Sequence, residues 1–258
     1  MKHDGHPRRA CADLIAEHHG EAPVGDHTVT VAVSLFNYAR FLEDCLESVR
    51  TQTHRPLELI VVDDASSSDD SLQVACAWIE KHADRFSRAT LLRHRDNQGL
   101  AQARNTAFAH ARTETVFVLD ADNQIHPRAI ARLHEALDGV SFAAAYSQLE
   151  FFGEQRGLGL ADYWSPAKFV NGNYVDAMAL IRRDAWQDVG GYTHIEGGWE
   201  DFDFWCKLVD ADLLALFVPE VLCRYRVHGT SMLRTDTAAS ERRLKVELTL
   251  RHPWLSLY

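Results

Sequence analysis

Two aspartates separated by one residue, Asp120 and Asp122, are the strongest chemical signal in the sequence. They follow the apolar run 115–119, and alternation along an extended segment points residues i and i+2 to the same side. Two carboxylates on one side suit a hard divalent cation such as Mg²⁺ or Mn²⁺. The alternative is a solvated turn at a strand end, where Asp and Asn are common. The position after a buried strand favours the cation site.

A histidine and a second acidic pair could add to such a site. His228 lies just past a strand-like run, and a neutral imidazole ligand would favour Mn²⁺ over Mg²⁺, although many histidines are merely hydrogen-bonded. Glu200 and Asp201 follow the segment 197–199 (Gly-Gly-Trp) and open a helix-like apolar pattern. Acidic residues there can simply satisfy the first N–H groups of a helix. After a double glycine and an aromatic residue, they also suit an active-site lip that carries a general base.

Polar residues after earlier apolar runs could bind a nucleotide. Asp63 and Asp64 end the run 57–62, and Asp64 could accept hydrogen bonds from a base or ribose. These aspartates could equally cap the next helix, a role that Asp69 or Asp70 would fill better. Asn97 and Arg104 surround a loop-to-helix transition, where backbone N–H groups and a guanidinium can meet a phosphate. A surface position on an ordinary amphipathic helix is the competing interpretation for Arg104.

Hydrophobic periodicity predicts the elements that must bring these residues together. Apolar strands at 29–34, 57–62, 90–92 and 115–119 alternate with helical patterns at 41–49, 72–79 and 100–108. This alternation predicts an α/β domain with a mostly parallel central sheet flanked by helices. Such sheets bind ligands beyond the carboxyl ends of their strands. The polar clusters 34–37, 63–70 and 120–123 all fall at those ends.

The pattern divides the chain into four parts. We expect a polar N-terminal extension at 1–27, a nucleotide-sugar-binding half at 28–140, an acceptor-binding and catalytic half at 141–232, and a C-terminal helix and tail at 233–258. The third part is less regular, with a Gly-rich loop at 151–160, a strand-like run at 175–181 and an aromatic loop near Trp199. An amphipathic helix is predicted at 237–250.

Composition limits the possible partners and compartments. The chain has 258 residues, 46% of them hydrophobic, which is enough for one large domain that folds on a core. Its net charge of -10 disfavours binding to nucleic acid. The spacing of the five cysteines shows no disulfide pattern, which favours a reducing cytoplasm. Residues 1–27 contain no apolar core of a signal peptide. We expect a cytoplasmic protein without a transmembrane segment; peripheral contact with the inner face of the membrane and the oligomeric state stay open.

Six segments in order resemble family 2 glycosyltransferases with the Rossmann-like glycosyltransferase A fold, over about 28–232. The segments are VAVSLFNYARFLEDCLESVRTQTHRPLELIVVDDASSSDDS, DNQGLAQARNTAFAHA, VFVLDADNQIHP, ALIRRDAWQDVGGY, GWEDFDFWCKL and YRVHGTSM. The resemblance implies metal-dependent transfer of a sugar, hexosyltransferase-type and with inversion, from a nucleoside diphosphate sugar to a hydroxyl acceptor. Uridine diphosphate sugars are common in similar enzymes, and Mn²⁺ or Mg²⁺ is the expected cofactor. Polysaccharide, glycan or glycoconjugate biosynthesis is the expected setting.

The resemblance also implies roles for individual residues. It places Asp120 and Asp122 in the Asp-x-Asp element, with Asp122 on the metal, Asp120 reaching the ribose or a metal-bound water, and His228 as an additional ligand. Asp201 matches the catalytic base, which its reference pKa near 3.9 would leave ionised at neutral pH. The remaining roles are nucleotide binding by Ser34, Phe36, Asn37, Asp64, Asn97 and Arg104, and acceptor binding by Gly198, Trp199 and Glu200.

The same residues also fit two rival functions, and one absent motif indicates which kind of glycosyltransferase to expect. A sugar nucleotidyltransferase also uses an α/β sheet, a nucleotide and a cation, but would carry a Gly-rich loop with Arg and Lys after the first strand. A binding module without turnover would be expected to lose Asp122 or Asp201, and both are present. The Gln-x-x-Arg-Trp element of processive membrane synthases is absent from the sequence, so we expect a non-processive transferase.

Overall fold

The computed structural model describes residues 11–20, 24–229 and 236–257. Its strands are β1 (Ala12–His19), β2 (Val29–Leu35), β3 (Leu57–Asp63), β4 (Arg88–His94), β5 (Thr115–Asp120), β6 (Gln124–Ile125), β7 (Ala144–Gly153), β8 (Gly157–Leu158), β9 (Ala179–Arg182) and β10 (Ala215–Val227). Its helices are α1 (Ala39–Arg50), α2 (Ser71–His82), the 3₁₀ turn η1 (Ala83–Arg85), α3 (Leu100–His110), α4 (Ala129–Leu137), α5 (Pro166–Phe169), α6 (Arg183–Asp188), α7 (Glu200–Asp210) and α8 (Asp236–Arg251).

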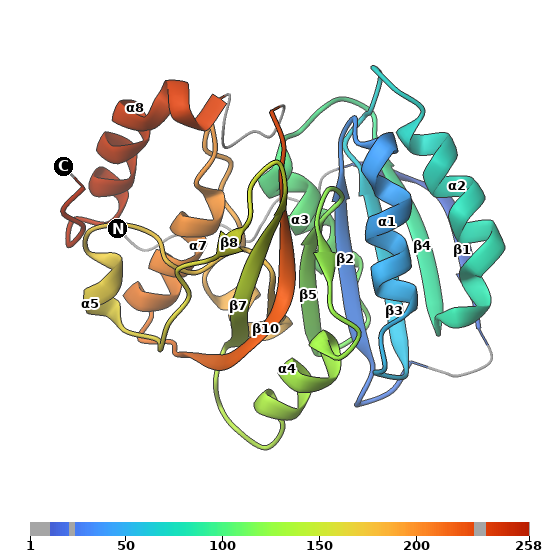
Figure 1. Ribbon diagram of the computed structural model, residues 1–258, viewed down its shortest axis with the longest axis horizontal. Coiled ribbons are helices and arrows are strands. Elements are labelled where there is room, and N and C mark those ends of the chain that lie inside the picture. Colours follow the sequence, from blue (N-terminus) through green and yellow to red (C-terminus); the bar gives the residue numbers. More distant parts are fainter. Residues whose placement is uncertain (1–10, 21–23, 230–235, 258) are drawn as a thin grey trace.

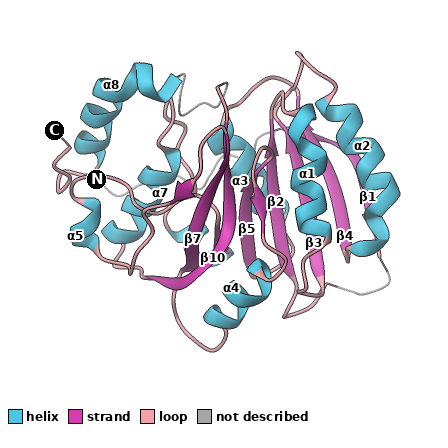
Figure 2. Cartoon of the chain, viewed as in Figure 1, coloured by secondary structure: helices cyan, strands magenta, loops and turns pink. Residues whose placement is uncertain are grey.

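In the described part of the chain, the strands form one mixed sheet in the order β1-β4-β3-β2-β5-β9-β7-β10-β6, with β8 paired to β7 (Figures 1 and 2). Strands β4, β3, β2 and β5 run parallel to one another, as do β7 and β10. Strand β9 joins these two groups through antiparallel pairing with β5 and β7. The prediction of an α/β sheet flanked by helices is confirmed.

The central elements form because their apolar residues recur at the spacing that each face requires. Every residue of β2 and β3 is buried, as expected for parallel strands covered on both faces. Helix α1 buries Leu42, Cys45, Leu46 and Val49, a stripe at the helical period. Helices α1, α2 and α4 pack into one core on one face of the sheet, and α3, α6, α7 and α8 pack into a second core on the other (Figure 1).

The N-terminal extension contains a strand that the sequence analysis did not predict. Strand β1 pairs antiparallel with β4, from Ala12 opposite His94 to His19 opposite Arg88, at one edge of the sheet. Its polar sequence lacks strict alternation, so the usual strand signal is weak. The strand forms because β4 supplies an edge with unpaired backbone groups. Residues 1–10 of the extension and 230–232 of the YRVHGTSM segment lie outside the described residues.

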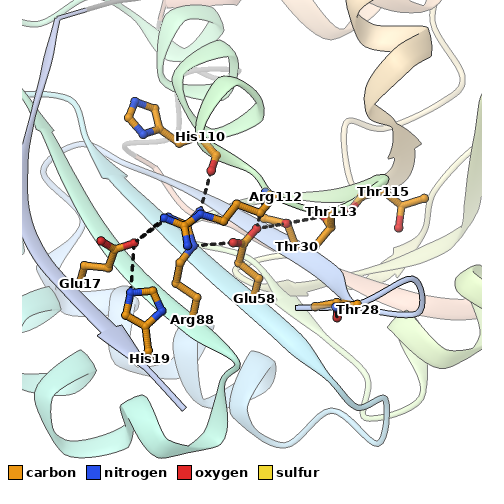
Figure 3. A network of polar contacts seen from close by, with 11 residues as sticks. Glu17, His19, Thr28, Thr30, Glu58, Arg88, His110, Arg112, Thr113 and Thr115 are labelled. Carbon is orange, nitrogen blue, oxygen red and sulfur yellow. Dashed lines mark hydrogen bonds and ion pairs between the residues drawn. The ribbon is translucent and has the colours of Figure 1, made fainter. Parts of the chain in front are cut away.

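A buried polar network helps to attach β1 to the sheet (Figure 3). Arg88 lies between two glutamates: its Nε donates to Glu58 Oε1 at 2.6 Å, and its Nη1 donates to Glu17 Oε1 at 3.0 Å. Arg88 Nη2 donates to the carbonyl of His110 at 2.6 Å. The other oxygen of Glu58 accepts from the Thr30 hydroxyl and from the backbone N–H of Arg112.

Two further details differ from the sequence-based expectations. Strand β4 is longer than the predicted 90–92. The expected Gly-rich loop at 151–160 is wrong in its first residues, because β7 continues to Gly153 and Gly157–Leu158 returns as β8. The predicted C-terminal helix is confirmed as α8. Among the described residues, no helix has the length and apolar character needed to cross a membrane.

Candidate active site

One cleft of about 1080 Å³ lies at the carboxyl ends of the central strands. It is lined by the residues expected to bind the nucleotide, Ser34, Phe36, Asn37, Asp64, Asn97 and Arg104, by Asp120 and Asp122, and by Gly198, Trp199, Glu200 and Asp201. His228 is the only residue of the predicted site outside this lining, and it contacts Asp122. The structure therefore brings residues from both halves of the chain into one site.

Asp64 shapes the loop before α3. Its carboxylate accepts backbone N–H bonds from Gln98 and Gly99, each at 2.8 Å, and lies 2.6 Å from His94 Nδ1. Asn97 Nδ2 donates a hydrogen bond to the backbone carbonyl of Asp64 at 3.3 Å. Gly99 has φ +86°, and a Cβ there would lie 2.6 Å from a ring nitrogen of His194. Both carboxylate oxygens of Asp64 thus already have protein partners.

The neighbouring loop after β2 is fixed in a similar way. The Asn37 side chain accepts backbone N–H bonds from Ser67 and Ser68 at 3.0 Å, and Asn37 itself has a positive φ of 55°. Phe36 beside it is 42% exposed, an unusual position for a large apolar ring. Ser34, at the end of β2, is buried against this loop. The arrangement leaves an aromatic face open to the cleft.

Arg104 is buried and bound to Asp120. Its Nη2 lies 3.0 Å from each oxygen of the Asp120 carboxylate. Its guanidinium carbon lies 5.3 Å from the centroid of the Tyr192 ring. The alternative of a surface position is wrong, because Arg104 is only 3% exposed. Burial acts to lower the pKa of Arg104, but the charges of Asp120, Glu200, Tyr192 and Asp201 together outweigh it and raise that pKa. Arg104 is therefore a fixed positive charge among carboxylates.

Asp122 and His228 form a second pair, with 3.0 Å between Asp122 Oδ2 and His228 Nε2. Both are buried, and the rings of Phe41 and Tyr38 lie 4.9 and 5.6 Å from that of His228. Burial, followed by the nearby Asp120 charge, raises the pKa of Asp122. Across the described residues, no three His, Cys, Asp or Glu side chains are grouped closely enough to hold a metal ion by themselves. The two aspartates of the Asp-x-Asp element thus have different protein partners.

Glu200 and Asp201 are the first two residues of α7. Trp199 precedes the helix with φ +67°, which turns the chain so that Glu200 and Asp201 occupy the first turn. Asp201 Oδ2 accepts a hydrogen bond from Asn173 Nδ2 at 3.0 Å. Burial raises the pKa of Asp201, partly opposed by Arg104, so the reference value expected from the sequence does not hold. Burial also raises the pKa of Glu200 to about 7, and Glu200 Oε2 has no hydrogen-bond partner within the described residues.

Two cleft residues were missed by the sequence analysis. Asp176 lines the cleft, and burial raises its pKa to about 7. Asn173 lines it as well and contacts Asp201. The Asn-Gly-Asn sequence at 171–173 is a turn signal that could have indicated a loop there. No local pattern indicated which catalytic residue that loop would meet.

Comparison with known proteins identifies the family. Residues 30–190 match the family model for glycosyl transferase family 2. The chain belongs to this family. Putative glycosyltransferase EpsE of Bacillus subtilis (strain 168) is 25% identical to this family 2 member over 213 residues, which cover 80% of this chain and 75% of that protein. An uncharacterized glycosyltransferase of Nostoc sp., alr2836, is 36% identical over 107 residues, which are 42% of this chain and 32% of that protein. The chain thus spans about a third of the Nostoc relative, and 13% of the O-antigen biosynthesis protein RfbC of Myxococcus xanthus.

Solved structures of glycosyltransferases share the fold. S. aureus TarS 1–349 in complex with UDP-GlcNAc has a TM-score of 0.68 at 16% identity, over 86% of this chain and 66% of that one. The mannosyltransferase PcManGT of Pyrobaculum calidifontis, in complex with GDP-Man and Mn²⁺, has a TM-score of 0.64 at 21% identity, over 89% of this chain and 66% of that one. These likenesses confirm the predicted glycosyltransferase A fold of this family 2 member.

Proposed function

We propose that the protein transfers a sugar from a nucleoside diphosphate sugar to a hydroxyl acceptor, with inversion, in polysaccharide or glycoconjugate biosynthesis. The observation that carries this proposal is that one cleft is lined by Asp64, Asp122 and Asp201 together, with His228 in contact with Asp122. Each group suits one part of the reaction: nucleoside binding, diphosphate binding and proton removal. Family membership supports the same assignment.

In this proposal, the donor nucleoside lies at the end of the cleft formed by Ser34, Phe36, Asn37, Asp64 and Asn97. The exposed Phe36 ring offers a face for the base, since aromatic rings stack favourably on one another. Asp64 holds the loop at Gln98 and Gly99 and meets the nucleoside through its remaining lone pairs. A uridine nucleotide is the favoured donor.

The residues around the diphosphate fit a divalent cation. Asp122 and His228 supply one oxygen and one nitrogen ligand, and Mg²⁺ or Mn²⁺ commonly completes its coordination with substrate phosphates and water. When bound, the cation would offset the negative charge that grows on the leaving diphosphate. Arg104 holds Asp120 in place, so that Asp120 can face the ribose or a water molecule. The Arg104 charge also lies close to the expected phosphates.

At the acceptor end, Asp201 takes the proton from the acceptor hydroxyl as that oxygen bonds to the anomeric carbon. The bond from this carbon to the diphosphate oxygen breaks on the opposite side, which inverts the configuration. Gly198, Trp199 and Glu200 line the acceptor side. With a pKa near 7, Glu200 is largely protonated below neutral pH and can donate a hydrogen bond to an acceptor oxygen. Alignment of donor and acceptor in the cleft excludes water as a competitor.

The donor and metal can be tested by thermal shift with UDP, GDP and TDP, each with and without Mn²⁺. A ligand that binds the folded state raises the melting temperature with its occupancy, so UDP with Mn²⁺ should give the largest shift. Chelation should eliminate transfer, and Mn²⁺ should restore it at least as well as Mg²⁺. Transfer that survives thorough chelation would contradict the proposed metal role.

Release of pyrophosphate from a sugar 1-phosphate and a nucleoside triphosphate would instead favour a nucleotidyltransferase, and binding without product would favour a binding module.

A further inference from the structure

Asn173 is held in one orientation opposite the start of α7. Its Nδ2 donates to Asp201 Oδ2 at 3.0 Å, and its Oδ1 accepts the backbone N–H of Val175 at 3.1 Å. An amide side chain has one accepting and one donating end, so the bond from Val175 fixes which end faces Asp201. The loop before β9 thus presents a hydrogen-bond donor to the Asp201 carboxylate.

The charges around Asp201 act on its carboxylate from several sides. Arg104 on α3 attracts the Asp201 carboxylate, while Asp120 at the end of β5 and Glu200 on α7 repel it. Asp176, the hydroxyls of Tyr192 and Tyr225, and the Cys206 thiol also interact with it. Arg104 Nε is buried and has no hydrogen-bond partner in the described part of the chain. Without Asn173, the Asp201 carboxylate would keep only the backbone N–H groups of Asp201 and Phe202 as hydrogen-bond donors among the described residues, and none of these comes from another part of the chain.

We propose that Asn173 is a positioning residue that holds the Asp201 carboxylate toward the acceptor and away from Arg104. This inference rests on the proposed function, in which Asp201 receives the acceptor proton. Asn173 itself does not take part in proton transfer, because an amide does not titrate in this range. Its contribution is to fix one oxygen of Asp201, which leaves the remaining lone pairs for the acceptor hydroxyl.

The most direct test measures the pKa of Asp201 without turnover. In protein labelled with ¹³C at the aspartate carboxyl carbons, the Asp201 signal is assigned by its loss in Asp201→Asn and followed from pH 3 to 9. Removal of a donor to the ionised form disfavours that form, so Asn173→Ala should raise the pKa of Asp201. Asn173→Asp should raise it further, because a second carboxylate faces the first. Asn171→Ala, an exposed residue of the same loop, is the matched control and should titrate as the wild type does.

A kinetic test uses UDP-GlcNAc and Mn²⁺ with water as the acceptor and follows UDP release against pH. Asn173→Ala should lower kcat about 10-fold to 100-fold, the scale expected for a misplaced catalytic group, with the KM for the donor unchanged. The acid limb of its pH profile should move to higher pH. An unchanged Asp201 titration in Asn173→Ala would overturn the positioning role, and so would a weaker UDP affinity with an unchanged kcat.

The two proposals fail in different ways. If Asp201→Asn retains turnover, Asp201 is not the base and the proposed function loses its acceptor side. If Asp201→Asn is inactive while Asn173→Ala matches the wild type in both tests, only the positioning role is wrong. Asn173→Gln, which keeps the amide on a longer side chain, should recover part of the lost kcat if the hydrogen bond to Asp201 is responsible.

Discussion

The parallel strands β2 to β5 bury charged side chains at both of their ends, and the two ends differ in how completely those charges are paired. At the amino ends, Glu58 is fully buried, and both of its oxygens accept hydrogen bonds, from Arg88, Thr30 and the Arg112 backbone (Figure 3). In the cleft at the carboxyl ends, Glu200 is equally buried, but its Oε2 has no partner among the described residues.

This difference separates a structural use of buried charge from a functional one. A buried charged group that lacks partners raises the free energy of the folded state. Its pKa therefore shifts in the direction that favours the neutral form of the group. Clefts that bind charged substrates collect such groups, because the substrate can supply the missing partners. Glu200 and Asp176, whose pKa values burial raises to about 7, fit this description. The amino-end network instead stabilises the fold and fastens β1.

The largest effect is expected from Asp201→Asn in the cleft. Loss of a general base lowers the rate of transfer by about 10² to 10⁴. Donor binding should stay close to that of the wild type, because the proposed function assigns Asp201 to the acceptor side. A product assay together with a calorimetric isotherm for UDP and Mn²⁺ measures both quantities. Wild-type turnover in this variant would remove Asp201 from its proposed role.

Glu58→Gln at the amino ends should act on stability alone. Removing one partner of a buried ion pair costs up to about 3–5 kcal/mol in the free energy of unfolding, and the lower part of this range is expected because Arg88 still pairs with Glu17. Urea unfolding measures this change, and activity per folded molecule should remain that of the wild type. Glu17→Gln is the matched control: the Glu17 side chain is 24% exposed, so its loss should cost only about 1 kcal/mol or less. Equal losses for both variants would show that burial does not distinguish the two glutamates.

Glu200→Gln should have the smallest effect on stability, with a distinct pH dependence. The pKa of Glu200 rises from 4.5 to about 7 on folding, so between these values the folded state binds more protons than the unfolded state. Its contribution to stability is therefore fully present below pH 4.5 and is lost as the pH rises through 7. The glutamine of the variant cannot titrate, so the variant does not lose stability in this way as the pH rises. It should be at least as stable as the wild type at pH 8. Urea unfolding at pH 5 and pH 8 tests this, and a variant much less stable at pH 8 would contradict it.

Several elements could be predicted because their signals are local. The continuous apolar runs of β2, β3 and β5 and the helical stripe of α1 indicate burial without any knowledge of the rest of the chain. The polar residues at the strand ends could be assigned to one cleft because parallel strands end at one edge of the sheet. Strand β1 could not be predicted in this way. Its pairing depends on the edge of β4, about 70 residues further along the chain.

The amino-acid sequence by itself determined the family, the order of the central strands and helices along the chain, and several of the acidic residues that line the cleft, because periodicity and motif spacing are properties of neighbouring residues. Only the tertiary structure decided which group each of those residues contacts: Arg104 for Asp120, His228 for Asp122 and Asn173 for Asp201. The physical reason is that these pairs are separated by 16, 106 and 28 positions. Their contacts, and the pKa shifts that follow from burial, arise when the packed sheet and helices remove the side chains from water.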